Sequence, residues 1–541
     1  MALTEAQRDD MVRLFDKYGS KAQVAHEMGV SRTTVKKYLH QLGFKGSLVQ
    51  GRKTDIAPVT LQLPEEGDIK RYIITSAQNN TKLHTRLWDN LTAYADFLDA
   101  EIMVSRFTYD KASYGKRAVK PGREATAADK DEAWWVPEVM PYAADTDPDR
   151  SRYQIAPGLQ LCAEMNIIPT AVKPLTGLEN YTGRESAIFP HVQFALQSIA
   201  SAPKEPTKFN YTTGTVTVRN YIAKKEGQRA SSRHGYGALI VEVDSSGSWW
   251  VRQLEAEEDG TFYDVPDAFD LANINIHKVS GGQITEGVVE AINWGDIHSS
   301  EIDDDIRRVN WGADGIIDAL RPRHQLMHDV QSFRSRSHHE MKKFGRMYQK
   351  FLDGIDSVED EVRETAGLIM EARRDETEMI IVSSNHDRHL DRWLDEADFK
   401  KDLLNAEFYL EAQLARVKAM KAGDDWDGNE WSLLRAGVGS EVLFLKQDDS
   451  YVIAGIEMAM HGDEGPNGAR GSTANLTKLG RKVNKGHDHT ATIMGDVWSA
   501  GACQLRFCYM TGPSSHSVSH VVTFPGGTRT MITVWEGKWR A

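Results

Sequence analysis

A carboxylate and an imidazole separated by one residue, Asp296 and His298, have the spacing of side chains that could share a metal ion. They follow a short apolar run at residues 288–292, and Gly295 lies between the run and the aspartate. The run predicts a buried strand that ends near this glycine. Because alternate residues of an extended chain point to the same side, both side chains can converge on one cation. We therefore expect a metal site at the end of this strand.

Four later segments carry polar residues of the same kinds. Three of the four open on an apolar, β-compatible run, as expected where loops at one edge of a sheet build a site. A lone histidine or asparagine of this kind is more often a hydrogen-bonded interior ring or a turn former. Their recurrence favours a metal centre. The segments are 326–329, 380–387, 452–462 and 483–489, and the candidate residues are Asp329, Asn385, His386, Asp387, His461, His487 and His489.

In order, the motifs Gly-Asp-x-His, Asp, Asn-His-Asp, His and Gly-His-x-His resemble those of the calcineurin-like metallophosphoesterase family, most closely its SbcD-type DNA nuclease branch. The resemblance covers residues 286–541 and implies an α/β sandwich of two sheets flanked by helices. The implied reaction is hydrolysis of a phosphodiester by a hydroxide that two divalent cations activate. The resemblance implies that Asp296, His298 and His489 hold one cation, that Asn385, His461 and His487 hold a second, and that Asp329 bridges the two. It also implies that His386 acts as general acid or phosphate ligand and that Asp387 orients the His386 imidazole.

The sequence departs from the family pattern at two motifs. The second motif is usually Gly-Asp-x-x-Asp, but here His328 precedes Asp329, and Ser384 replaces the glycine before Asn385. Asp314 and Asp318 could compete for the bridging position. We favour Asp329 because it follows a plausible strand, whereas a helix is expected over residues 313–320.

The ligand types bear on the metal, and a nearby basic stretch bears on the substrate. Mixed oxygen and nitrogen ligands favour Mn²⁺ or Fe²⁺ over Mg²⁺, and Zn²⁺ also fits.

Residues 333–346 are basic, and Arg334 and Arg336 could follow the phosphates of a polynucleotide beside the metals. The alternative is a solvated helix that Ser337 caps. His338, His339 and His389 match no motif and are expected at the surface or against substrate.

The N-terminus forms a basic module within an acidic chain. The first 53 residues hold ten Lys and Arg against five Asp and Glu, although the whole chain has a formal charge of −13. Thr4, Ser20 and Ser31 each precede a helical pattern, and the stretch 20–39 resembles the helix-turn-helix family. That resemblance implies Arg32, Thr33 and Thr34 near base edges and Lys36 and Lys37 near phosphates. The alternative is a three-helix bundle for protein contacts or oligomerisation.

The remaining organisation follows from periodicity and length. We expect an α/β chain with a helix-turn-helix module at 1–48, a linker at 49–69, a middle α/β domain at 70–285 of unassigned role, and the metallophosphoesterase domain at 286–541. The middle domain should open with a strand, a helix over 82–98 and a second strand. Helical patterns at 357–374 and 397–421 could form an oligomer contact or a lid, with core packing as the default.

Composition is that of a globular protein, with 40% hydrophobic and 26% charged residues in 541. No apolar run is long enough to cross a bilayer and no signal-peptide core is found, so no membrane partner and a cytoplasmic location are expected. The three cysteines, Cys162, Cys503 and Cys508, indicate no disulfide framework.

Three functional classes follow. The first is a metal-dependent DNA nuclease, because a DNA-binding module and a phosphodiester-cleaving site share one chain. Such a design is also similar to the pre-early DNA-degradation proteins of tailed phages, which implies host DNA as substrate and the host cytoplasm as location. The second class is a phosphatase or cyclic-nucleotide phosphodiesterase with a regulatory N-terminal module, and the third is a non-catalytic DNA-binding regulator. DNA is the expected partner, and a homo-oligomer stays open.

Overall fold

The computed structural model describes residues 3–18, 21–41, 57–109, 134–144, 151–265, 276–507 and 510–540. The chain divides into two compact units, Met1–Ala57 and Pro58–Ala541. No helix in the described ranges has both the length and the apolar character needed to cross a membrane. Ser20 and Cys508 lie outside the described residues.

The described residues of the first unit form three short helices, as the sequence predicts. The hydroxyl of Thr4 accepts a hydrogen bond from the Gln7 amide at 3.3 Å, and that of Ser31 accepts one from the Thr34 amide at 3.1 Å, so both residues cap helices. Gly29, at φ +63°, lies in the turn between the second and third helices. The helices are α1 (Glu5–Tyr18), α2 (Lys21–Glu27) and α3 (Arg32–Gln41), and they share a core of Met11, Phe15, Val24, Val35 and Leu39.

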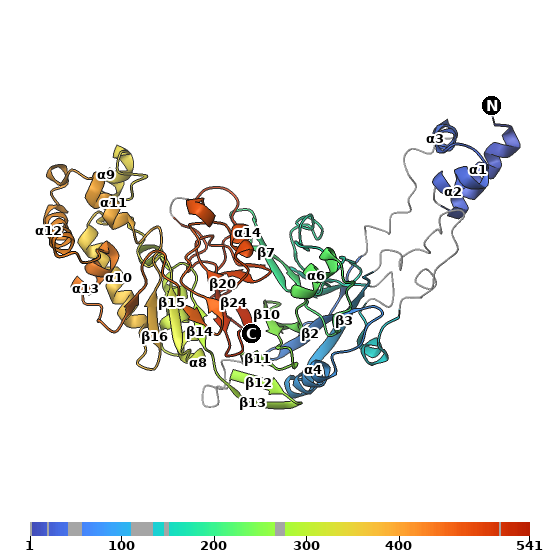
Figure 1. Cartoon of the computed structure of the whole chain (residues 1–541), viewed down its shortest axis with the longest axis horizontal. Coiled ribbons are helices and arrows are strands. Elements are labelled where there is room, and N and C mark those ends of the chain that lie inside the picture. The colour runs from blue at the N-terminus through green and yellow to red at the C-terminus, as the bar shows by residue number, and fades with distance from the viewer. Residues whose placement is uncertain are drawn as a thin grey trace. The chain divides into compact units, whose positions relative to one another are not determined.

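The second unit opens with the expected strand, helix and parallel strand. In this four-stranded sheet β2 (Ile69–Gln78) pairs in parallel with β3 (Ala100–Phe107), and α4 (Thr85–Leu98) connects them (Figure 1). The antiparallel strands β9 (Gly237–Asp244) and β10 (Trp249–Glu255) complete the order β10-β9-β2-β3. A small three-stranded sheet follows, formed by β11 (Phe262–Asp264), β12 (Ile276–Ser280) and β13 (Gln283–Gly287).

The largest sheet joins the middle of the chain to its C-terminal region. Strand β7 pairs with β21 in antiparallel register, with Gln197 opposite Thr492. The expected division into domains at residue 285 is therefore corrected, because strands from both sides of it form one hydrogen-bonded sheet. The predicted linker 49–69 is also too long, since β1 lies within it and pairs with β4. The order is β1 (Val59–Thr60), β4 (Arg152–Ala156), β5 (Leu159–Cys162), β6 (Ser186–Phe189), β8 (Lys208–Thr212), β7 (Ala195–Ile199), β21 (Thr492–Met494), β22 (Val497–Ser499), β20 (Lys482–Lys485), β19 (Ile456–Glu457) and β18 (Val452–Ile453).

A six-stranded sheet supplies the other half of the site. Its strands β14 to β17 run parallel, β23 is antiparallel to β14, and β24 is antiparallel to β23. The strand expected at 288–292 begins later, and Val288 is exposed because it precedes the sheet. The order is β17 (Leu443–Phe444), β16 (Glu378–Ile381), β15 (His324–Met327), β14 (Ala291–Asn293), β23 (Ser519–Thr523) and β24 (Arg529–Thr533).

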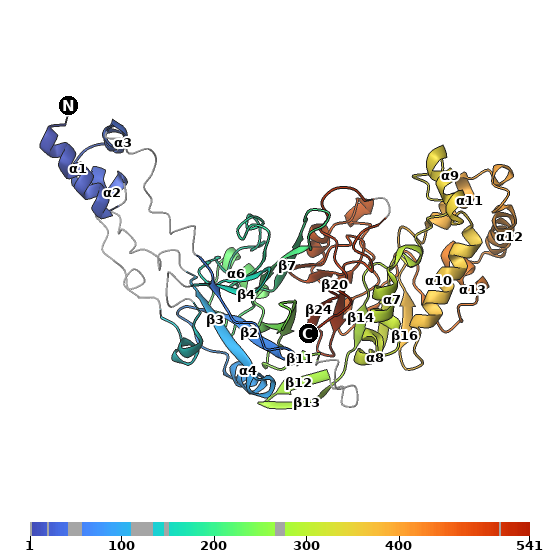
Figure 2. The same ribbon diagram turned by 180° about the vertical axis from the view of Figure 1, so that it is seen from behind.

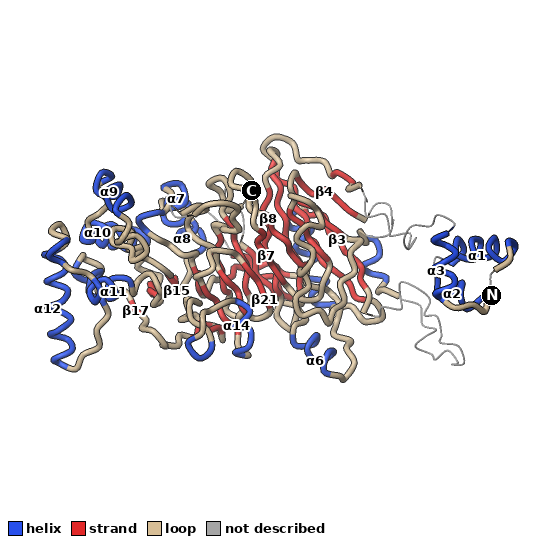
Figure 3. Tube along the Cα trace, turned by 90° about the horizontal axis from the view of Figure 1, so that it is seen from above, coloured by secondary structure: helices blue, strands red, loops and turns tan. Residues whose placement is uncertain are grey.

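The sheets pack face to face and helices cover them. Leu161 and Trp498 of the eleven-stranded sheet share a core with Val241 of the four-stranded sheet and with Val521 and Met531 of the six-stranded sheet. Helices α7 to α13 lie at the side of the six-stranded sheet (Figure 2), and Figure 3 shows the strands gathered in the middle of this unit. In the described residues after α4, the helices of this unit are α6 (Lys225–Ser232), α7 (Asp304–Trp311), α8 (Ile316–Leu320), α9 (Phe344–Asp353), α10 (Val358–Ala372), α11 (His389–Glu396), α12 (Ala406–Ala422), α13 (Gly428–Arg435) and α14 (Thr473–Leu476). The 3-10 turns described there are η2 (Pro137–Tyr142), η4 (Ser299–Glu301), η5 (Phe399–Lys401), η6 (Pro466–Gly468) and η7 (Thr477–Leu479).

Candidate metal centre

The candidate ligands follow strands of two different sheets. Asp296 and Asp329 come after β14 and β15 of the six-stranded sheet, and Asn385 comes after β16. His461 and His487 come after β19 and β20 of the eleven-stranded sheet. The expectation of a single sheet edge is corrected, because packing of the two sheets brings two sets of strand ends together.

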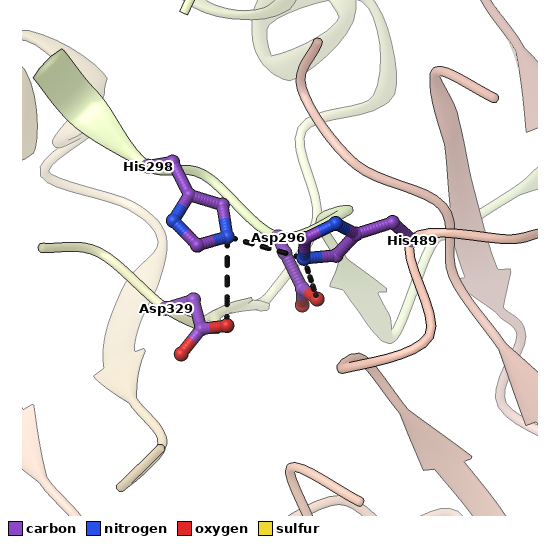
Figure 4. A group of neighbouring side chains, drawn as sticks. All are labelled: Asp296, His298, Asp329 and His489. Atoms are coloured by element: carbon purple, nitrogen blue, oxygen red, sulfur yellow. Dashed lines mark hydrogen bonds and ion pairs between the residues drawn. The ribbon is translucent and has the colours of Figure 1, made fainter. Parts of the chain in front are cut away.

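Four buried residues form the first group of ligands (Figure 4). Their ligand atoms all lie within 4.8 Å of one another, in an arrangement that could hold a metal ion. His489 Nε2 lies 3.1 Å from Asp296 Oδ2, and His298 Nε2 lies 3.5 Å from Asp329 Oδ2. The two imidazoles face each other with their Nε2 atoms 3.1 Å apart. The group is Asp296, His298, Asp329 and His489.

A second group of side chains adjoins the first through Asp329. The amide oxygen of Asn385 lies 3.0 Å from His461 Nε2 and 3.1 Å from His487 Nδ1. His461 Nε2 is also 3.3 Å from Asp329 Oδ2, the oxygen that faces His298 in the first group. Asp329 therefore lies between the two groups, where the resemblance places a bridging carboxylate. The competing Asp318 is in α8 and pairs with Arg374 instead.

The donor atoms fit a cation. Asp296 Oδ1 and His461 Nδ1 are buried and have no hydrogen-bond partner among the residues that the structure describes. Such atoms are costly to bury unless something else satisfies them. Burial lowers the pKa of His298 well below its ordinary value, with His386 adding to the effect, so this imidazole is neutral and offers a lone pair.

The carboxylates of the site are held in their charged form. Burial alone would raise the pKa of Asp329 and Asp296, but the facing histidines hold both below the ordinary range. Burial opposes protonation of His461, yet Asp329 and Asp296 outweigh it and raise the pKa of His461 to about 9. A cation bound here must displace that proton, so binding is coupled to proton release.

His386 lies at the edge of the first group and Asp387 lies behind it. Nδ1 of His386 donates to the Ser332 carbonyl at 3.1 Å, and its ring packs edge-on against His298 with centroids 4.6 Å apart. Nε2 of His386 is thus the atom that can serve a substrate. The expectation that Asp387 orients this ring is corrected: its Oδ1 accepts from the Gln331 amide at 3.1 Å and its Oδ2 from Ser384 Oγ at 2.7 Å, which ties two ligand-bearing loops together.

Several ligands sit on strained backbone. His298, Asp329, His487 and His489 all have positive φ, at 47°, 46°, 73° and 53°, a conformation that non-glycine residues rarely adopt. Lys485 braces the loop of the last two histidines. It is fully buried, and its ammonium donates to the Gly486 carbonyl at 2.5 Å and pairs with Asp488 at 2.9 Å.

The basic residues expected against DNA do not all face solvent. Arg336 is buried and forms a two-pronged ion pair with Asp402, at 2.5 and 2.7 Å. It is therefore a structural residue, and the expectation that it contacts DNA is wrong. Arg334 is half-buried, and α9 begins at Phe344, so Ser337 caps no helix. Arg32, Thr33, Thr34, Lys36 and Lys37 lie in the first unit, on α3.

Sequence reasoning missed residues that surround the ligands. Phe507 packs against His298 and His489, with centroids 4.8 and 4.6 Å away, and His516 lies 4.9 Å from His489. No motif marks these two. The sequence predicts His389 at the surface or against substrate, and in the structure its ring centroid lies 4.6 Å from that of His386 and 4.7 Å from that of His338. The only sequence signal for the cluster of His338, His386 and His389 is the number of histidines between residues 328 and 389.

Comparison with known proteins gives one family assignment. No family model matches the chain. Protein A1 of Escherichia phage T5 is 36% identical over 485 residues, which cover 87% of this chain and 83% of that protein.

Proposed function

The chain belongs to the same family as protein A1 of Escherichia phage T5, and from the geometry of the candidate metal centre together with the N-terminal helices we propose that it is a metal-dependent DNA nuclease. The observation that carries the proposal is Asp329 Oδ2, which lies 3.5 Å from His298 and 3.3 Å from His461. A carboxylate oxygen shared between two ligand groups suits a pair of cations, and such pairs catalyse in-line displacement at phosphorus. The ligand types support Mn²⁺ or Fe²⁺ first, with Zn²⁺ or Mg²⁺ as alternatives.

Each group has a role in this proposal. The cations, when bound, would supply Lewis-acid stabilisation of the phosphate oxygens and acidify a water molecule. His386 would present Nε2 to the leaving oxygen or to the scissile phosphate, because its Nδ1 is engaged by the Ser332 carbonyl. Asp296, His298, Asp329 and His489 would hold one cation, and Asp329, Asn385, His461 and His487 the other.

The first unit would supply DNA binding. Its three helices and the excess of basic residues over the first 53 positions support a helix-turn-helix in which α3 enters the major groove. Full-length protein with Lys36→Glu and Lys37→Glu should bind DNA more weakly, with the slope of log affinity against log salt reduced by about 2. Hydrolysis of a small phosphodiester should not change. An unaltered DNA affinity would reassign this unit to protein contacts.

The decisive experiment measures cleavage of linear, circular and single-stranded DNA with Mn²⁺, Mg²⁺ or chelator, and of bis-nitrophenyl phosphate in parallel. The His461→Ala variant is the control for the metal centre. Chelator-sensitive DNA cleavage that this variant loses is the expected result, and the circular substrate distinguishes endonuclease from exonuclease action. Host DNA would be the natural substrate in this proposal, because the relative comes from a phage.

A second candidate is a phosphatase or cyclic-nucleotide phosphodiesterase. It is favoured by the ion pair of Arg336 with Asp402, which removes one of the two cations expected to follow a polynucleotide. Hydrolysis of the small ester without cleavage of any DNA would select this function. If neither substrate is hydrolysed with any of the metals but the protein binds DNA, the chain is a non-catalytic DNA-binding regulator.

A further inference from the structure

Helix α12 is apolar on two opposite faces, but the described fold covers only one. Phe408, Tyr409 and Ala412 are buried and face α11, α13 and η5. A helix that is apolar all round is normally covered all round. Figures 1 and 3 show α12 at the outer edge of its unit. Its other face exposes Leu410, Leu414 and Val417 at 50%, 56% and 57%.

Charges on this exposed face change sign along the helix. Glu407 and Glu411 lie in the N-terminal half, and Lys418 and Lys421 lie in the C-terminal half. At 100° per residue, residues 407, 414 and 421 lie on nearly one line, because each step of seven turns the helix by about 700°. Leu414 is therefore the midpoint of the stripe, with an acidic end and a basic end.

The exposed face of α12 is complementary to the same face of a second copy when the two helices pack antiparallel. A two-fold axis at Leu414 places Leu414 of both copies in contact and sets Glu407 of each against Lys421 of the other. On one side of this seam Leu410 of one copy meets Val417 of the other, with their heights about 1.5 Å apart. On the other side Lys418 meets Glu411, which also pairs with Arg435 of its own copy at 2.5 Å. Apolar residues thus meet apolar residues and each acidic group meets a basic one.

From this pattern we infer that α12 is a self-association surface through which two copies of the chain form an antiparallel, two-fold symmetric dimer. The occupant is a second copy because the charge order fits α12 itself when reversed. Exposed apolar residues with flanking opposite charges are the ordinary composition of a helical interface. The inference is independent of the proposed nuclease activity.

Sedimentation equilibrium of the full-length protein at micromolar concentration tests whether α12 forms this dimer contact. The wild type should be a dimer. Leu414→Glu should raise the dimer Kd by at least about 100-fold, because both copies place the new carboxylate at the seam. Glu407→Lys or Lys421→Glu alone should raise it about tenfold, and the two changes combined should restore it to within about threefold, because the pair is reversed rather than lost.

Ile222→Glu is the matched control, since Ile222 is an exposed apolar residue in a loop outside this helix. It should leave the dimer unchanged. Circular dichroism of each variant confirms folding, which should be intact because Leu414 is half-exposed. A monomeric wild type, a dimer that persists in Leu414→Glu, or single charge reversals whose combination is no better than either alone would each overturn the inference.

Discussion

Replacing Gly486 by alanine should remove metal binding without removing a single ligand. A Cβ at this position would lie 3.1 Å from Asp296 Cγ and 3.2 Å from His328 Cβ, and it would overlap Asp296 Oδ1, whereas ordinary contacts begin at 3.4 Å. Asp296 is fully buried and cannot swing into solvent. Relief therefore needs a displacement of the carboxylate of about 1 Å.

That displacement is large compared with what a metal site tolerates. Ligand distances must stay within about 0.2 Å of their preferred values, so a shift of about 1 Å takes Asp296 out of the coordination sphere. We expect metal affinity and kcat on bis-nitrophenyl phosphate to fall at least about 100-fold, or about 2.7 kcal/mol. The overpacked site should also lower the free energy of unfolding by about 1–3 kcal/mol.

Isothermal titration with Mn²⁺ and hydrolysis of the small ester measure both effects. The control is Gly367→Ala on α10, where an added Cβ meets no atom within 4 Å. At this exposed helical position alanine should raise stability by about 0.5–1 kcal/mol and leave metal binding unchanged. A folded Gly486→Ala protein that binds Mn²⁺ and hydrolyses the ester like the wild type would refute the assignment of Asp296 as a ligand.

Three further predictions concern the centre and its support. Asp296→Asn should abolish hydrolysis while leaving DNA affinity in a gel-shift assay largely intact; loss of DNA binding as well would contradict the separate roles of the two units. Lys485→Met should lower the free energy of unfolding in urea by about 2 kcal/mol, because it leaves the partly exposed Asp488 unpaired, and an unchanged midpoint would show that the pair does not brace the loop. Burial lowers the pKa of His520 to about 3 in the folded state, whereas the same imidazole in the unfolded chain is protonated near pH 6.5. Stability should therefore fall by about 2 kcal/mol between pH 6.5 and 5.0, and a His520→Gln variant should have a shallower pH dependence of its urea midpoint.

The sequence by itself determined the candidate ligand residues and their order. Asp, Asn and His at the ends of apolar runs are local features, and short runs ending at a turn place polar groups at strand ends in any α/β fold. The three N-terminal helices were equally local, because Thr4 and Ser31 cap them and Gly29 lies between the last two. The strand, helix and strand over 69–107 followed from periodicity in the same way.

Tertiary structure alone decided how those residues meet. The pairing of β7 with β21 joins residues nearly 300 positions apart, and no periodicity in either strand specifies its neighbour. The partner of Arg336 was also decided by the fold. Its charge predicts a phosphate contact, but the tertiary structure pairs it with Asp402 instead. Asp387 stands next to His386 in sequence, yet backbone direction turns its carboxylate to Gln331 and Ser384.

The physical distinction is one of range. Helix caps, strand ends and metal-binding residue types are fixed by interactions within a few residues, so they can be seen in the sequence. Which sheet a strand joins, whether an arginine is buried, and whether an apolar stripe such as that of α12 is covered all depend on burial against distant segments. The sequence therefore identified the candidate ligands of this centre, and only the packing of two sheets placed Asp329 between the two groups.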